Sequence, residues 1–197
     1  MDDGLTAKGR ATRARILAAA ADLVLRRGVA ATQIDDIRRA AGVSGSQMTH
    51  YFHDKRTLID DVIERQTDAV LAIQNSLDTF EAWRRWADQV VARQTARRFR
   101  GGCELGSLAG QLVESSPETR AHLADGYDRW LDRFRHDLRA MRDQGLLRTD
   151  ADPDALANTM LAAMQGGVLL AQTLRRPDPL RDSLDAALSH LESFAPR

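Results

Sequence analysis

Apolar residues recur along this chain at intervals of three and four positions, with polar and charged residues between them. Over residues 12–27, Ile16, Ala20 and Val24 share one side, and Gly28 follows directly. Such spacing predicts an amphipathic helix, and a glycine after the last apolar position is typical of a helix end. Val and Ile are sparse and unclustered in the rest of the chain, which argues against strands. We therefore predict an all-α protein.

Two short helices joined by a tight turn are predicted next. Thr32 and Asp35, three positions apart, predict a helix start with a capping hydroxyl and an acidic residue in the first turn. Gly42 is expected to end this helix, because glycine adopts a left-handed backbone at little cost. Ser44 and Gln47 then form a second capping box. The pattern predicts a helix-turn-helix unit.

The second short helix has one apolar and one polar side. Met48 and Phe52, four positions apart, are expected to face inward, with Val43 buried in the turn. Such a polar side, able to donate and accept hydrogen bonds, suits the DNA major groove, where base edges present both kinds of group. Its residues are Ser46, Gln47, Thr49, His50 and Tyr51.

Six further helices complete the pattern and bring the predicted total to about nine. Side-chain caps are expected before most of them, and three of these caps precede a proline at the first helical position. The expected caps are Asp54, Asp78 (paired with Glu81), Ser116, Asp152 and Asp178. The predicted ranges are 55–76, 78–100, 105–114, 117–144, 153–175 and 179–194.

Charge divides the chain into a basic and an acidic part. The whole chain is neutral, but residues 8–56 hold 10 Lys and Arg against 4 Asp and Glu, a net charge of +6, so the remainder carries −6. This split is expected of a DNA-binding module on an effector domain, although charge that only solvates helix faces is the alternative. We assign residues 1–53 to a helix-turn-helix DNA-binding domain and 54–197 to a ligand-binding and dimerisation domain.

Residue counts and apolar runs argue against several other classes of protein. With one cysteine, Cys103, the chain cannot build an internal disulfide or a cysteine-based metal site. The five histidines show no metal-ligand spacing, and we expect neither a metal nor a cofactor. No apolar run approaches the roughly 18 residues of a membrane span. The polar first residues are no signal peptide, so the expected location is the cytoplasm.

Aromatic and apolar residues of the second half are candidates for a ligand pocket. All three tryptophans lie there, in a chain with only 5% aromatic residues. Small-molecule sites are mostly apolar with a few polar groups, although aromatics at helical spacing also form plain core. Our candidates for binding a small apolar or aromatic molecule are Trp83, Trp86, Phe99, Leu105, Leu108, Tyr127, Trp130, Phe134, Met160, Met164 and Gln165.

The last two predicted helices, within residues 153–194, are apolar over much of their surface. Gly166 and Gly167 interrupt the first of them, and each glycine costs about 1 kcal/mol of helix stability relative to alanine. Such a cost indicates that another backbone approaches closely. We predict that these two helices form a homodimer interface; completion of the chain's own core is the alternative.

A spaced set of residues in the first part of the chain carries a family resemblance: Ile16-Leu17, Ala20, Gly28, Thr32, Ile37, Ala41-Gly42-Val43-Ser44, Phe52, Lys55 and Leu58. With this set the chain resembles the TetR family of bacterial transcriptional regulators. Residues 101–112 and 164–176 resemble one drug-responsive branch of that family. The resemblance implies a homodimer that binds a palindromic DNA operator, usually as a repressor, and leaves it when a small molecule enters the effector domain.

The resemblance also implies roles for individual residues. Residues 45–51 would form the recognition helix, which includes Gly45 and Ser46. Gln47 is the best base reader, since its amide can pair with adenine, while Thr49 offers a methyl group to thymine and His50 a donor or acceptor. The expected phosphate contacts are Arg13, Thr32, Arg38, Ser44, Tyr51 and Lys55.

The chain departs from the family's usual pattern at three of these positions. Thr49 stands where tyrosine is usual, and Tyr51 stands where histidine is frequent. Arg38 replaces a usual alanine. We therefore expect Tyr51 to take over the phosphate contact of the missing tyrosine, and Arg38 to add a contact or to point into solvent.

Two other functions are weighed against a ligand-responsive regulator. In an enzyme, Cys103 would be the nucleophile, with His122 or His136 as its base, but no catalytic signature surrounds it and a lone cysteine is usually inert core. The other alternative is a helical interaction protein, or an activator without a small-molecule switch. The departures at Thr49 and Arg38 favour that reading, and the basic N-terminal part argues against it.

Overall fold

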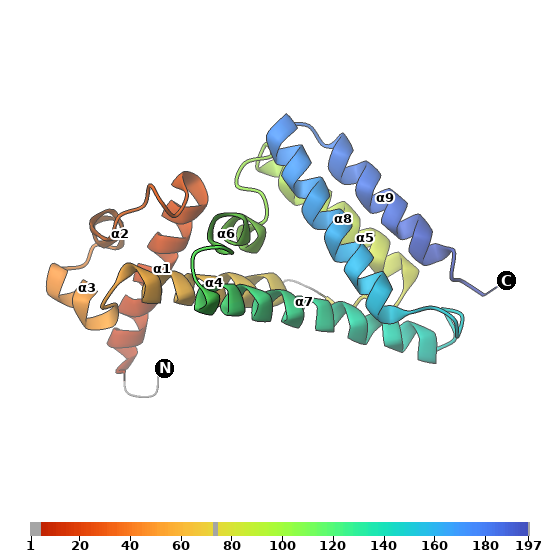
Figure 1. The fold of residues 1–197 in the computed structure, drawn as a ribbon, viewed down its shortest axis with the longest axis horizontal. Coiled ribbons are helices and arrows are strands. Elements are labelled where there is room, and N and C mark those ends of the chain that lie inside the picture. Colours follow the sequence, from red (N-terminus) through yellow and green to blue (C-terminus); the bar gives the residue numbers. More distant parts are fainter. Residues whose placement is uncertain (1–4, 73–74, 197) are drawn as a thin grey trace. The chain divides into compact units, whose positions relative to one another are not determined.

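The computed structural model describes residues 5–72 and 75–196, and all of their regular structure is helical, as predicted (Figure 1). Their order along the chain is α1 (Ala7–Arg27), α2 (Ile34–Ala41), α3 (Gly45–Tyr51), α4 (Lys55–Ala72), α5 (Phe80–Ala96), α6 (Glu104–Leu112), α7 (Pro117–Asp143), α8 (Pro153–Leu174) and α9 (Asp178–Glu192).

The turn between α2 and α3 forms as local chemistry predicts. Gly42 has the left-handed φ of 63° that ends α2, and Val43 is buried behind it. Ser44 caps α3 through a bond from the backbone N–H of Gln47, and the Gln47 side chain accepts from the N–H of Ser44 in return. The predicted second capping box is confirmed, and it fixes where α3 begins.

The start of α2 differs from the prediction. Thr32 is fully buried, and its hydroxyl donates to the carbonyl of Gly28 at 2.8 Å, so it does not cap the helix. Gln33 is the N-cap residue instead, and its backbone N–H donates to the carboxylate of Asp36, not of Asp35, at 3.4 Å. The Gly28 carbonyl at the end of α1 has drawn the threonine hydroxyl inward, and α2 starts one residue later as a consequence.

Several other helix ends also move. The first helix begins before residue 12, since Thr6 caps α1 by accepting from the N–H of Gly9. Thr79, not Asp78, caps α5 by accepting from Ala82, and α5 ends at Ala96, well before residue 100. At the start of α9 the predicted cap Asp178 is already helical, preceded by Pro177 without a side-chain cap.

The end of α4 is also earlier than predicted. The helix is described to Ala72; residues 73–74 of its predicted last turn lie outside the described residues, and Ser76 is not helical. Leu77 and Ser76 are instead held by the buried carboxylate of Asp137 on α7, which accepts from the Leu77 N–H at 2.9 Å.

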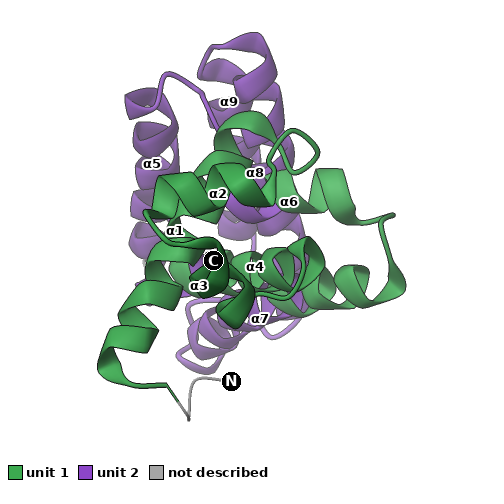
Figure 2. Cartoon of the chain, turned by 90° about the vertical axis from the view of Figure 1, so that its left-hand side faces the viewer, with its two compact units in different colours: residues 1–69, 107–126 green, residues 70–106, 127–197 purple. Residues whose placement is uncertain are grey.

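The chain forms two compact units (Figure 2). Unit 1 comprises residues 1–69 and 107–126, and unit 2 comprises residues 70–106 and 127–197. Each has its own buried core: Ile16, Ile37, Leu58 and Ile63 in unit 1, and Trp83, Phe134, Leu138, Met141, Met160 and Leu180 in unit 2. The compact units do not show which residues bind DNA or a ligand, so the division into functional domains between residues 53 and 54 stays a prediction.

Within unit 2, α8 and α9 lie side by side and pack extensively (Figure 1). Gly167 is buried where they approach, and a Cβ there would lie 2.9 Å from the Cα of Leu180 and would also collide with the hydroxyl of Ser183. The predicted close approach of another backbone is therefore real at Gly167, and that backbone belongs to α9. Gly166 is exposed, and a Cβ there would meet no atom within 4 Å.

Replacing Gly167 by alanine should destabilise the protein. The added methyl group forces α8 and α9 apart, and overpacking of this kind costs about 1–3 kcal/mol. Gly110→Ala is the matched control, since a Cβ at Gly110 on α6 meets nothing within 4 Å; it should be neutral or stabilising by up to about 1 kcal/mol through helix propensity. Urea unfolding of both variants measures this. Equal stability of Gly167→Ala and the wild-type protein would contradict the packing described.

Candidate functional site

One side of α3 is buried and the other is exposed. Met48 is 2% and Phe52 3% exposed, which confirms that this pair faces inward. Gly45, Ser46, Gln47, Thr49 and His50 are exposed, and Tyr51 is half-buried. The residues predicted to face outward thus lie together on one short helix that is anchored from behind.

Hydrogen bonds within α3 limit which atoms remain available on this face. The side-chain carbonyl of Gln47 accepts from the Ser44 N–H at 2.9 Å, which leaves its NH₂ donor and the second lone pair of its oxygen for a base. The Thr49 hydroxyl donates to the Gly45 carbonyl at 3.1 Å, and the Ser44 and Ser46 hydroxyls lie 3.0 Å apart. In a paired contact with adenine, the Gln47 oxygen would be shared between the base and the Ser44 N–H.

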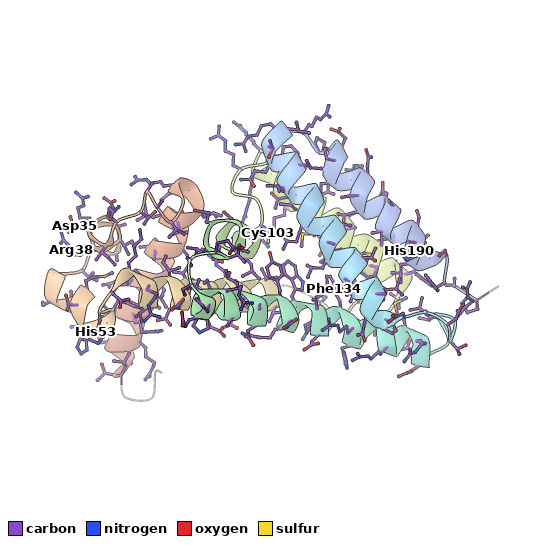
Figure 3. The ribbon with its side chains drawn as sticks, viewed as in Figure 1. Asp35, Arg38, His53, Cys103, Phe134 and His190 are labelled. Atoms are coloured by element: carbon purple, nitrogen blue, oxygen red, sulfur yellow. The ribbon has the colours of Figure 1, made fainter. Side chains whose placement is uncertain are left out.

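The predicted phosphate contacts are in different environments. Arg13 is ion-paired with Asp61 and lies over the ring of Phe52. Arg38 donates to Asp35 at 2.7 Å on the surface of α2, where both are labelled in Figure 3. This bond from the guanidinium lowers the pKa of the Asp35 carboxyl. Thr32 is wholly buried, which places its hydroxyl out of reach of DNA in this conformation.

The backbone of Val29, in the loop between α1 and α2, is held from both sides. Lys55 donates from its Nζ to the Val29 carbonyl at 2.7 Å, and the Gln111 side chain on α6 accepts from the Val29 N–H at 2.8 Å. A Cβ at Gly28, whose φ is 82°, would lie 2.9 Å from the same Gln111 oxygen. No local sequence signal predicts the Gln111 contact, because 82 residues separate its partners.

In unit 2, Phe134 on α7 is the centre of an aromatic cluster (labelled in Figure 3). Its ring centroid lies 4.9 Å from that of Trp83, 5.3 Å from that of Trp86 and 6.3 Å from that of Trp130, all edge to face. Such pairs add stability beyond the area that they bury. The cluster brings all three tryptophans together.

A cavity of about 110 Å³ adjoins this cluster. Three of the predicted ligand contacts line it: Trp86, Trp130 and Met164. Sequence reasoning missed the rest of its lining, which is Val70, Gln89, Val90, Arg93, Gln94, Cys103, Glu104 and Val168. The charged members escaped notice because charged residues are not expected beside an apolar cavity, and Arg93 and Glu104 are found there as an ion pair.

The other predicted ligand contacts do not line the cavity. Trp83, Leu105, Phe134 and Met160 are at most 1% exposed and form core. Leu108 is buried in unit 1, and Phe99 borders a separate, open hollow together with Thr95, Arg98, Arg100 and Arg175. Gln165 donates to the sulfur of Cys103 at 3.4 Å, and burial raises the pKa of the half-buried Tyr127.

Cys103 is buried, and its sulfur accepts from the Gly106 N–H and from Gln165. Burial raises the pKa of its thiol, which keeps it neutral near pH 7 and unreactive as a nucleophile. His122 belongs to unit 1, where its Nδ1 lies 3.3 Å from an Asp60 oxygen, and His136 in unit 2 is exposed. Among the described residues of unit 2, the bonds to the Cys103 sulfur come from Gly106 and Gln165 and not from a base, which the enzyme alternative requires.

Within residues 5–72 and 75–196, no three His, Cys, Asp or Glu side chains are grouped so that they could hold a metal ion. None of the helices there combines the length and the apolar character that crossing a membrane requires.

Comparison with known proteins agrees with these features. Residues 16–62 match the model of the bacterial regulatory proteins of the tetR family, and residues 79–187 match that of the tetracyclin repressor-like C-terminal domain. The transcriptional regulator AcuR of Cereibacter sphaeroides is 31% identical over 163 residues, which are 78% of this chain and 73% of AcuR. The HTH-type transcriptional repressor DhaR of Mycobacterium sp. (strain GP1) is 24% identical over 85% of each chain.

Solved structures show the same relationship. The regulatory protein TetR from Rhodobacter sphaeroides matches with a TM-score of 0.80 at 25% identity, over 90% of this chain and 97% of that one. A TetR transcriptional regulator from Chloroflexus aurantiacus shares the fold with a TM-score of 0.76 at 24% identity, over 96% of this chain and 98% of that one. With its helix-turn-helix and its helical C-terminal part both matched, the chain belongs to the TetR family of DNA-binding transcriptional regulators, which are not enzymes.

Proposed function

We propose that this regulator is a homodimeric repressor that binds a palindromic operator and is released by a small molecule. The exposed polar face of α3 supports DNA binding. This short helix is anchored by Met48 and Phe52, and its outer side has no apolar residues. The similarity to the repressor DhaR supports repression over activation. A bacterial regulator meets its operator in the cytoplasm, which is the location that we propose.

The DNA contacts fall into two groups. Base edges would be read by Gln47, Thr49 and His50. The DNA backbone would be approached by Gly45 and Ser46, at the start of α3. Ser44, Tyr51, Arg13, Arg38 and Lys55 would contact phosphates. The partners that Arg13, Arg38 and Lys55 already have would hold these side chains in position. For Thr32 we propose a supporting role only, since it is buried.

The dimer would form through residues 153–194. Three leucines on α8 expose large apolar side chains: Leu169 is 63%, Leu170 52% and Leu174 49% exposed. Water-exposed leucines grouped on one helix mark an interaction surface, and a second copy of the same helix is the partner that a two-fold operator requires. The exposed small residues Ala162 and Gly166 extend this surface along α8.

For a ligand to release the protein from DNA, the cavity must be coupled to the exposed polar side of α3, which we call the DNA face. The long helix α4 begins with Lys55, which holds Val29, and its Val70 lines the cavity. In α6, Glu104 lines the cavity and Gln111 holds the same Val29 backbone. A ligand that prefers one position of these helices would shift α3 within the dimer, so that half-sites about 34–36 Å apart no longer fit.

A helical interaction protein, or an activator without such a switch, is the second candidate. The ion pairs that already engage Arg13 and Arg38 are the observation that favours it, because they lower the free positive charge of the DNA face. Operator binding that no small molecule weakens would support it.

Gln47→Ala should relax sequence preference. Loss of the amide donor should weaken operator binding by about 1–3 kcal/mol and leave binding to a scrambled duplex unchanged. Lys55→Ala is the contrasting variant: it should weaken both duplexes alike and reduce the salt slope by about 1. Fluorescence anisotropy at several salt concentrations measures both effects. Because Gln47 also completes the cap of α3, helix content is checked by circular dichroism. Equal losses of Gln47→Ala on both duplexes would exclude base reading.

Leu170→Asp should dissociate the dimer. Burial of an unpaired carboxylate against a second copy is unfavourable enough to raise the dimer dissociation constant at least about tenfold. Val113→Asp is the control, because Val113 is also exposed, at 40%, but lies on the α6–α7 connection outside the proposed interface. Analytical ultracentrifugation over a concentration series gives both constants. Dissociation by Val113→Asp, or a dimer unaffected by Leu170→Asp, would place the interface elsewhere.

A further inference from the structure

The indole of Trp130 is the most informative group of the cavity. Trp130 is 6% exposed and lines the cavity, and its Nε1–H has no hydrogen-bond partner among the residues that the structure describes. Buried polar groups are nearly always paired, so an orphaned donor at a cavity wall calls for an acceptor. A neighbouring indole, that of Trp83, also lacks a partner, but Trp83 is fully buried and does not line the cavity.

Other polar groups of the lining already have partners within the protein. The Gln94 amide donates to the carbonyl of Gly102 at 3.2 Å. The Arg93 guanidinium donates to Glu104, also at 3.2 Å, and two donors reach the sulfur of Cys103. A ligand that satisfied Trp130 would therefore disturb none of these bonds. The Gln89 side chain also borders the cavity, but Gln89 is exposed, whereas Trp130 is buried. The indole N–H is thus the buried, unpaired donor of the lining at which a ligand can be oriented.

The volume of the cavity limits the size of a ligand. At about 110 Å³ it is smaller than the engineered cavity of about 150 Å³ that binds benzene in another protein. A molecule of about six non-hydrogen atoms or fewer fits this space. Trp86, Met164 and Val168 make its walls largely apolar, so most of such a molecule must be apolar as well.

Charge limits the ligand further. The charged residues of the lining are Arg93 and Glu104, which form an ion pair. The Glu104 side chain is only 13% exposed and also pairs with Arg97. A ligand carboxylate would have to share Arg93 with Glu104 and give up its hydration inside a largely apolar cavity, and an ammonium would find Glu104 already paired with two arginines.

We infer that the cavity takes a small neutral molecule, largely apolar, with a single hydrogen-bond acceptor such as a carbonyl oxygen that the indole N–H of Trp130 binds. This inference rests on the proposed function, since it names the class of effector for the site that the proposal assigns. The sequence predicts an apolar or aromatic molecule, and the inference restricts this class to compact molecules with one hydrogen-bond acceptor.

The test compares two probes of equal size with the full-length protein. Cyclopentanone carries the acceptor, and methylenecyclopentane replaces its oxygen by a CH₂ group. Ligand-observed NMR titration gives both dissociation constants in the wild-type protein, in Trp130→Phe and in Trp83→Phe. The preference for the ketone should be about fivefold to tenfold larger in the wild-type protein than in Trp130→Phe, which is the range of one hydrogen bond.

The controls make the result specific. Trp83→Phe removes the other unpaired indole N–H and should leave the preference unchanged. Butanamide should bind more tightly than butanoate, which has the same size and a negative charge. The inference is overturned if Trp130→Phe keeps the preference for the ketone, or if Trp83→Phe abolishes it equally. It is also overturned if butanoate binds more tightly than butanamide, or if neither cyclopentanone nor methylenecyclopentane binds up to its solubility limit.

Operator titrations separate this inference from the proposed function. If cyclopentanone shows the expected Trp130 dependence and operator affinity is unaffected by it, the ligand class stands and release by that ligand fails. If the wild-type protein does not bind its operator at all, the DNA-binding proposal fails, and the probe affinities still decide the ligand class.

Discussion

A helix of seven residues does not hold its shape alone, and the exposed polar side of α3, which we propose binds DNA, depends on how α3 is anchored. Isolated helices shorter than about 12–15 residues are marginal in water. Here Met48 and Phe52 are buried behind the helix, and the Ser44–Gln47 capping box fixes its first turn. Because both anchors act on the inner side and the first turn, the outer side stays polar and available.

The anchoring extends to the loop before α2. Lys55 and Gln111 hold the two backbone groups of Val29, and the Thr32 hydroxyl closes the same loop on the Gly28 carbonyl. A backbone held on both its donor and its acceptor side cannot shift without breaking a bond. We propose that a movement of α4 or α6 would reach α2 and α3 through this loop.

Local chemistry in the sequence predicted more of the fold than of the sites. The Gly42 turn, the Ser44 cap and the inward pair Met48 and Phe52 all depend on residues within one or two helical turns, and each is present. Where a prediction was wrong, the residue makes a different contact: the Thr32 hydroxyl donates to the Gly28 carbonyl instead of capping α2. The cap at Thr79 replaced the equally plausible one a residue earlier.

The cavity illustrates what periodicity cannot predict. Apolar spacing identified aromatic residues but did not separate those that fill the core, such as Trp83, from those that border a space, such as Trp130. It also missed Arg93 and Glu104, whose placement there depends on their pairing across 11 residues of chain. Vacant volume and unpaired donors arise from how helices pack, and only the three-dimensional structure contains them.

We propose that this protein reads a two-fold symmetric DNA site through α3. To test this, the purified protein is incubated with fragmented genomic DNA from the bacterium that encodes it, and the bound fragments are recovered and sequenced. A two-fold symmetric site predicts enrichment of a shared inverted repeat with half-sites about one helical turn, or a multiple of it, apart. Recovery of fragments without a common sequence, or of one without two-fold symmetry, would contradict it.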